Sequence, residues 1–290
     1  MKTTPAEHLD PESVTFHGLD GIALIGDQWN YRPPASEGQP TVLLLHGGGQ
    51  TRFSWRKTGQ ILANRAFHVV ALDARGHGDS DRAPSGDYST EALTEDVLRV
   101  VYQIGRSVVL VGASMGGLTS ILAAHQAGSK LVTKLILVDV VPRFEKSGSS
   151  RIRDFMSSHL DGFDSLEAAA DAVATYLPHR TKPRSPDGLK KNLRLRGGRW
   201  YWHWDPAFLA RPNESRTERT NQLENAARNL DIPILLIRGM LSDVVSAEGV
   251  RDFLDKVPAA EFVELLGVAH TAASDDNDAF SALVVDFALR

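Results

Sequence analysis

The stretch SVVLVGASMGGLTSILAAHQ, residues 107–126, decides the fold. A run of β-branched and aliphatic residues ends at Gly112, and an apolar segment typical of a helix follows from Leu118. Between them lies Gly-x-Ser-x-Gly, a pattern that forms a sharp turn and holds its serine out at the carboxyl end of a strand. The stretch therefore predicts a strand, a strained turn and a helix, with Ser114 as a nucleophile. A phosphate-binding loop is the alternative, but the lysine and the spacing of such loops are missing.

Short apolar runs of the same kind recur on both sides of this stretch, separated by helical patterns. Each ends near Gly or Asp, which is typical of strands buried on both faces of a parallel sheet. We therefore expect a doubly wound, mostly parallel α/β sheet. The segments 14–18 and 22–29, around Asp20-Gly21, predict a hairpin at its edge. The runs are TVLLLH (41–46), HVVALD (68–73), KLILVDV (134–140), IPILLIRG (232–239) and EFVELLG (261–267).

The alternation of strand and helix patterns stops at about Pro142 and resumes at about Leu230. Residues 143–228 show helical patterns and no strong strand run, which predicts a mainly helical cap inserted into a core of residues 1–142 and 229–290. The insert holds 12 Arg and 4 Lys against 11 acidic residues, a net charge of +5 that leaves −9 for the core. We interpret these arginines as solvated surface, with attraction of anionic substrates as the alternative.

Composition excludes several classes of function. The 290 residues carry a net charge of −4, which disfavours nucleic acids and anionic membrane surfaces as partners. The absence of cysteine excludes disulfides, thiolate metal sites and a cysteine nucleophile. Residues 1–20 lack the apolar centre of a signal peptide, and no run approaches a membrane-spanning helix. The expectation is a cytoplasmic protein that acts on a small molecule, and the sequence leaves a homodimer open.

His46-Gly47-Gly48-Gly49 closes the first buried run. Glycines let a backbone amide turn inward at the end of a strand, where it can stabilise an oxyanion. Together with the amide of Met115, one such amide predicts a two-donor oxyanion hole. Gly48 is the favoured donor and Gly49 the alternative, and a turn needed only for packing is the competing interpretation.

A serine nucleophile needs a base that takes its proton. Of the ten histidines, His270 alone combines a loop after a predicted strand with a position late in the chain. The carboxylate that orients this histidine has two candidates, both at the carboxyl edge of the sheet. Asp243 lies on the longer loop and is favoured, whereas Asp139 is expected to brace the entry to the insert.

The segment Arg75–Asp81 is rich in His and Asp, a composition that also occurs in metal-binding loops. A metal site is not predicted, because no further ligands occur nearby at matched spacing. We interpret the segment as a glycine-rich turn held by side-chain hydrogen bonds.

Three of the five tryptophans lie together in the insert, at Trp200, Trp202 and Trp204. Their alternation buries one side of the segment and lets the other face a cleft. The cluster therefore predicts either a substrate-binding wall or packing between insert and core.

Taken in order, these motifs resemble the α/β-hydrolase superfamily with a cap domain. The resemblance implies a triad of Ser114, His270 and Asp243, an oxyanion hole from Met115 and Gly48, and a cap that shapes the substrate pocket. Serine at the turn distinguishes the chain from epoxide hydrolases and haloalkane dehalogenases, which resemble it but carry aspartate there. The matching segments are HGGG (46–49) with Trp55 behind it, DARGHGDSD (73–81), GASMGG (112–117), RGMLSD (238–243) and GVAH (267–270).

We therefore expect a serine hydrolase that cleaves a carboxylic ester or lactone through an acyl-enzyme, without a cofactor or metal. The same motifs are similar to those of cofactor-free haloperoxidases with perhydrolase activity and of carbon–carbon bond hydrolases acting on ring-cleavage diketones. A small-molecule receptor on the same fold is the non-enzymatic alternative.

Overall fold

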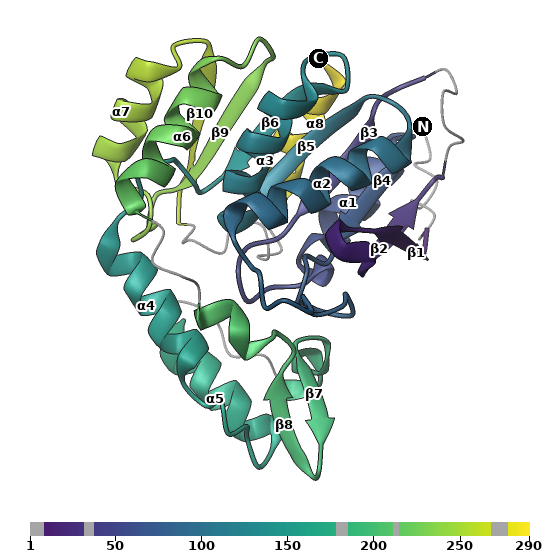
Figure 1. Ribbon diagram of the computed structural model, residues 1–290, viewed down its shortest axis with the longest axis vertical. Coiled ribbons are helices and arrows are strands. Elements are labelled where there is room, and N and C mark those ends of the chain that lie inside the picture. Colours follow the sequence, from purple (N-terminus) through teal and green to yellow (C-terminus); the bar gives the residue numbers. More distant parts are fainter. Residues whose placement is uncertain (1–8, 32–37, 178–184, 211–214, 268–277) are drawn as a thin grey trace, which may run out of the picture.

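A computed structural model describes residues 9–31, 38–177, 185–210, 215–267 and 278–290. Within these ranges, eight strands form one sheet in the order β1-β2-β4-β3-β5-β6-β9-β10 (Figure 1). Strand β2 is antiparallel to β1 and β4, and all other neighbours are parallel. This confirms the mostly parallel sheet with an N-terminal hairpin at its edge. The strands are β1 (Glu12–His17), β2 (Ala23–Trp29), β3 (Thr41–Leu45), β4 (Val69–Leu72), β5 (Val108–Ala113), β6 (Val132–Val138), β9 (Ile234–Gly239) and β10 (Ala260–Leu265).

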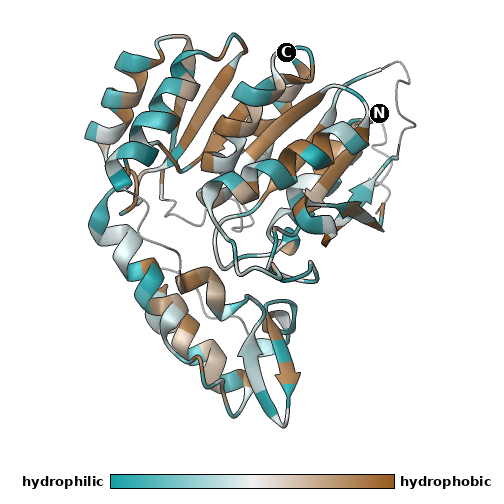
Figure 2. Cartoon of the chain, in the orientation of Figure 1, coloured by the Kyte–Doolittle hydropathy of each residue, from teal (hydrophilic) through white to brown (hydrophobic). Residues whose placement is uncertain are grey.

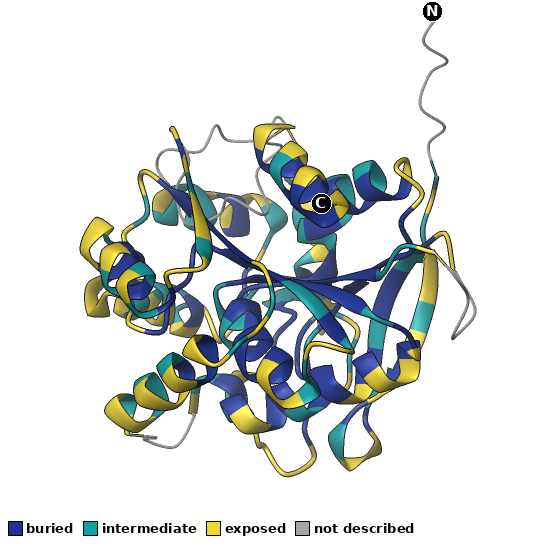
Figure 3. Ribbon diagram, turned by 90° about the horizontal axis from the view of Figure 1, so that it is seen from above, coloured by how far each residue is buried: buried dark blue, intermediate teal, exposed yellow. Residues whose placement is uncertain are grey.

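Helices cover both faces of this sheet. Helices α1 and α8 pack on one face, and α2, α3, α6 and α7 pack on the other. Figure 3 shows the buried strands between helices whose outer sides are exposed. No helix in the described ranges is long and apolar enough to cross a membrane. The helices are α1 (Arg56–Ala63), α2 (Thr90–Ile104), α3 (Met115–Ala127), α6 (Arg216–Arg228), α7 (Ala247–Lys256) and α8 (Asp278–Leu289).

The apolar strands explain this layering, because successive side chains of a strand point to opposite faces of the sheet. In β3, Val42 and Leu44 join the core under α1 and α8, whereas Leu43 and Leu45 join the core under the other helices. The central strands are accordingly apolar along their length (Figure 2). Because this core packs against both faces of the sheet, the carboxyl ends of the parallel strands keep fixed positions relative to one another along one edge.

The inserted region differs in two respects from the mainly helical cap expected over residues 143–228. It contains an antiparallel hairpin, β7 (Leu193–Arg196) with β8 (Arg199–Trp202), beside helices α4 (Lys146–Ser157) and α5 (Leu166–Tyr176). Its last helix, α6, buries Leu223 against α3 in the core of the sheet domain. The buried residues of α6, Leu223, Ala226 and Ala227, belong to the core of the sheet domain. From here on, the word cap refers to residues 143–210.

Candidate active site

Ser114 lies in a strained turn between β5 and α3. Its φ of 47° and ψ of −114° are sparsely populated by residues with a side chain. Its amide donates to the carbonyl of Val138 at 3.1 Å, which ties the turn to β6. A Cβ atom at Gly112 would lie 2.4 Å from the carbonyl oxygen of Gly116, so the turn requires glycine. These are the features of a turn that presents a nucleophilic serine.

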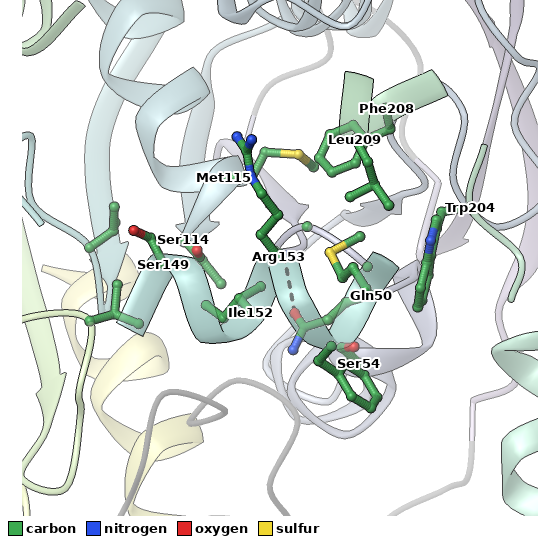
Figure 4. A pocket seen from close by; sticks show the side chains of 18 of the residues that line it. Gln50, Ser54, Ser114, Met115, Ser149, Ile152, Arg153, Trp204, Phe208 and Leu209 are labelled. Atoms are coloured by element: carbon green, nitrogen blue, oxygen red, sulfur yellow. Dashed lines mark hydrogen bonds between the residues drawn. The ribbon is translucent and has the colours of Figure 1, made fainter. Parts of the chain in front are cut away.

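Ser114 lines a pocket of about 360 Å³ between the sheet and the cap (Figure 4). The glycine loop 47–49 and Met115 form its floor, and helices α4 and α5 form one wall. The opposite wall comes from the cap segment that follows β8. Apolar residues dominate the lining, which includes Ile152, Phe155, Met156, Val173, Trp202, Trp204, Phe208 and Leu209.

The hydrogen bonds of the glycine loop distinguish Gly48 from Gly49. The amide of Gly47 donates to Gln50 Oε1 at 3.1 Å, and the amide of Gly49 donates to His77 Nε2 at 3.1 Å. Among the described residues, no acceptor is present for the amide of Gly48. Gly48 also faces the pocket, because a Cβ atom there would lie 3.4 Å from the Phe208 ring and 4.0 Å from Met115 Sδ, and both side chains line the pocket.

Asp139 follows directly after β6 and is fully buried. Its φ of 49° lies in the left-handed region, and its amide donates to Ile237 O at 2.7 Å. Its carboxylate accepts hydrogen bonds from the amide of Gly239 at 3.1 Å and from Ser242 Oγ at 2.6 Å. A backbone amide and a hydroxyl therefore hold this carboxylate in place beside the serine turn.

Asp243 has a different environment. Its side chain is 41% exposed, and its Oδ2 accepts a hydrogen bond from Arg151 Nε of α4 at 2.7 Å. A Cβ atom at Gly148 in the same helix would lie 2.3 Å from the carbonyl oxygen of Asp243. Asp243 thus fastens the cap to the loop after β9, the bracing role that the sequence suggested for Asp139.

His270 lies outside the described residues, so its role as the base stays a prediction. The described chain reaches Gly267, just after β10, and resumes at Asp278, where α8 begins.

The segment 73–81 is a turn held by ion pairs and hydrogen bonds. Asp73 is fully buried and accepts from the amides of Arg52 at 2.7 Å and Asp79 at 3.0 Å. The guanidinium of Arg52 also pairs with Asp73, and Arg75 pairs with Asp96 at 2.6 Å. These contacts support the structural interpretation, and the described part of the chain holds no cluster of three potential metal ligands.

The three tryptophans of the cluster have different positions relative to the pocket. Trp202 and Trp204 both line the pocket and stack on each other with ring centroids 4.8 Å apart. The backbone of Trp200 instead pairs with that of Phe163 through hydrogen bonds of 2.7 and 2.8 Å, and its side chain is not part of the pocket lining.

Two charged residues that the sequence did not single out, Arg153 of α4 and Arg219 of α6, also line the pocket. The only available signal for Arg153 was its position in the first helix of the insert, next to the apolar residue Ile152 and close to the point where the chain leaves the sheet.

The sequence profile of the Alpha/beta hydrolase family matches residues 42–283. Protein phosphatase methylesterase 1 of Bos taurus is 35% identical over 173 residues, which cover 56% of this chain and 44% of that protein. Esterase Rv0045c of Mycobacterium tuberculosis is 32% identical over 173 residues, which cover 57% of each chain. The matched region thus spans less than half of the methylesterase and little more than half of the mycobacterial esterase.

Solved structures share the fold over 97% of the chain. Esterase Rv0045c superposes with a TM-score of 0.74 at 25% identity, covering 97% of this chain and 93% of that one. An α/β hydrolase from Novosphingobium aromaticivorans DSM 12444 superposes with a TM-score of 0.80 at 24% identity, covering 97% and 99%. Since the family profile spans most of the chain and the serine turn, sheet order and cap are all in place, this chain belongs to the α/β-hydrolase family.

Proposed function

We propose that the chain is a serine esterase that cleaves a carboxylic ester or lactone through an acyl-enzyme. The observation that carries this proposal is the strained turn at Ser114, which lines a largely apolar pocket together with Gly48 and Met115. In this mechanism Ser114 attacks the ester carbonyl while His270 accepts its proton. The amides of Gly48 and Met115 stabilise the oxyanion. As the ester C–O bond breaks, His270 gives its proton to the leaving alcohol oxygen, and a water activated by His270 then hydrolyses the acyl-enzyme to release the acid and Ser114.

For the acid of the triad, the contacts favour Asp139 over Asp243. A carboxylate that orients a catalytic histidine works best when it is buried and held by hydrogen bonds. Asp139 meets both conditions, whereas Asp243 is partly exposed and bonded to the Arg151 guanidinium. We therefore place Asp139 in this role and Asp243 in the attachment of the cap.

The pocket also favours a substrate that carries a negative charge. Arg153 and Arg219 are among its lining residues, and no acidic side chain is among the described residues that line it. Figure 4 shows the Arg153 side chain extending from α4 into the pocket. A guanidinium in a largely apolar site binds carboxylate through charge-assisted hydrogen bonds. An ester with an apolar body and an anionic group therefore fits the site.

Labelling with a fluorophosphonate probe, followed by intact-mass measurement, tests the mechanism. We expect one adduct per chain, located at Ser114 by peptide mapping, and no adduct in Ser114→Ala. With aryl esters, the variant should lose several orders of magnitude in kcat, because only the oxyanion hole and binding remain. A folded wild-type protein that takes no label, or a Ser114→Ala variant with near-normal kcat, would contradict the proposal. Turnover of diketones without turnover of esters would instead indicate carbon–carbon bond cleavage.

A further inference from the structure

Three histidine rings form a buried row beneath the glycine loop. His46 follows β3, His77 belongs to the 73–81 turn, and His203 belongs to the cap. Their ring centroids are 5.2 Å apart from His46 to His77 and 5.7 Å apart from His77 to His203. All three side chains are at most 5% exposed. The row therefore joins the cap to the core directly behind the pocket.

Hydrogen bonds fix the protonation of each ring. A backbone amide can only donate, so a ring nitrogen that accepts from one carries no proton. Each of the three rings accepts from one amide, which leaves the other nitrogen as the donor in a neutral ring. The accepted bonds are Ala74 N to His46 Nε2 at 3.0 Å, Gly49 N to His77 Nε2 at 3.1 Å and Gly78 N to His203 Nδ1 at 2.7 Å.

The same rings hold three successive peptide units of the glycine loop. His46 Nδ1 donates to Gly47 O at 2.7 Å, which holds the peptide unit whose amide belongs to Gly48. His77 accepts from the amide of Gly49, and His203 Nε2 donates to Gly49 O at 3.2 Å. Because each peptide unit is planar, fixing its carbonyl also fixes the direction of its amide.

We infer that His203 is a positioning residue for the oxyanion hole: docking of the cap holds the Gly49 carbonyl through His203 and so restrains the loop that carries the Gly48 amide, whose own peptide unit is held by His46. The inference rests on the proposed function, since it assigns that amide to the oxyanion. His203 is the member of the row supplied by the cap, so undocking the cap removes its bond to Gly49 O. The peptide units that join Gly48 to Gly49 and Gly49 to Gln50 are then less restrained. The Gly48 amide is therefore less well preorganised to bind the oxyanion.

Electrostatics agrees with a permanently neutral ring. Burial, followed by the nearby His46, lowers the pKa of His203 to about 3. Burial also lowers the pKa of His46 below its ordinary value. His203 therefore keeps the same hydrogen-bonding pattern over the pH range in which a catalytic histidine titrates.

Two substitutions separate the two hydrogen bonds of His203. The amide nitrogen of glutamine occupies the place of Nε2, so His203→Gln keeps the donation to Gly49 O and loses the bond from Gly78. The carboxamide of asparagine occupies the place of Nδ1, so His203→Asn keeps the bond from Gly78 and loses the donation to Gly49. The matched control is Arg194→Gln, which removes another contact between cap and core, to Gly78 O at 2.9 Å and Asp79 at 2.6 Å.

The measurements are kcat, KM, melting temperature and the inhibition constant of a trifluoromethyl ketone, which forms an oxyanion on Ser114. In His203→Asn we expect kcat to fall about 10–100-fold, less than the loss of an oxyanion donor itself, with KM within twofold. The inhibitor should weaken in the same proportion. His203→Gln should stay within threefold of the wild type, and Arg194→Gln should lose stability without losing kcat.

Equal losses of kcat in His203→Asn and His203→Gln would overturn the inference, as would losses that follow melting temperature across all three variants. Wild-type kcat in His203→Asn would overturn it as well. Failure of the proposed function is recognised separately, because the wild-type protein would then not react with the fluorophosphonate at Ser114.

Discussion

Arg151 of α4 donates to Asp243 across the boundary between cap and core, at 2.7 Å. The same guanidinium donates to Tyr176 O at 3.1 Å, at the end of α5, and stacks 4.7 Å from the Tyr176 ring centroid. One side chain thus joins both cap helices to the loop after β9. The carboxylate of Asp243 is part of this attachment, which supports our proposal that Asp139 orients the base.

The two aspartates should consequently differ in mutants. Asp139→Asn should lower kcat by roughly 10⁴-fold, because an amide in place of the carboxylate selects the wrong imidazole tautomer. Asp243→Asn should lower kcat by less than tenfold and reduce the melting temperature of the protein. Steady-state kinetics with an aryl ester, beside thermal melts, checks both. The opposite ranking of kcat would return the triad carboxylate to Asp243.

Arg153 should set a preference for charge. In Arg153→Gln we expect kcat/KM for a 4-nitrophenyl hemiglutarate to fall about tenfold, the value of one charge-assisted hydrogen bond. The neutral 4-nitrophenyl valerate should change less than twofold. The control is Arg196→Gln, an exposed arginine at the end of β7. Parallel losses for both esters, or no loss for either, would refute an anionic subsite at Arg153.

The pocket tryptophans should set a preference for size. Trp202→Leu and Trp204→Leu should change the ratio of kcat/KM between long and short acyl esters, because each lost aromatic contact removes about 1–3 kcal/mol from substrates that reach it. Trp200→Leu is the control, since its side chain is not part of the pocket lining. The ratio cancels any loss of folded protein. If this ratio of kcat/KM were unchanged in both pocket variants, the Trp202–Trp204 stack would contribute to packing and not to substrate selection.

The buried histidines should make folding stability depend on pH. His203 has a pKa of about 3 in the fold, through burial and then His46 and Arg194, with Asp79 opposing. An unfolded histidine has a pKa of about 6.5, so between these values the unfolded chain binds more protons. Stability should therefore fall as pH drops below about 6.5. Urea midpoints from pH 7 to 5 should fall less steeply in His203→Gln, and parallel curves would contradict the prediction.

Local pattern was sufficient to predict the sheet and the serine turn. The strands around Ser114 are continuous apolar runs, and a Gly-x-Ser-x-Gly turn between strand and helix has few structural alternatives. The β7–β8 hairpin was not predicted because its strands are only four residues long, too short for the alternation in Leu193–Arg196 to distinguish a strand from a loop. The pair Gly197-Gly198 was the available signal for a two-residue hairpin turn.

The choice between the carboxylates depends on three-dimensional contacts that sequence spacing does not contain. Asp139 and Asp243 both follow strands at the same sheet edge, and both precede His270. What separates them is burial and the position of Arg151, a residue of the insert. The histidine row likewise joins residues far apart in the chain, so no local pattern relates His203 to Gly49.

The hairpin turn at Gly197-Gly198 is a suitable place for a label that reports on the position of the cap. Both glycines have positive φ, of 55° and 81°, and a Cβ atom at either would meet no other atom within 4 Å. The chain contains no cysteine, so a single thiol introduced by Arg196→Cys beside this turn would be the unique site for a fluorescent or spin label. The label would sit on the same hairpin that leads into His203. Docking of the cap thereby becomes observable in solution, without any change to the residues that carry the chemistry.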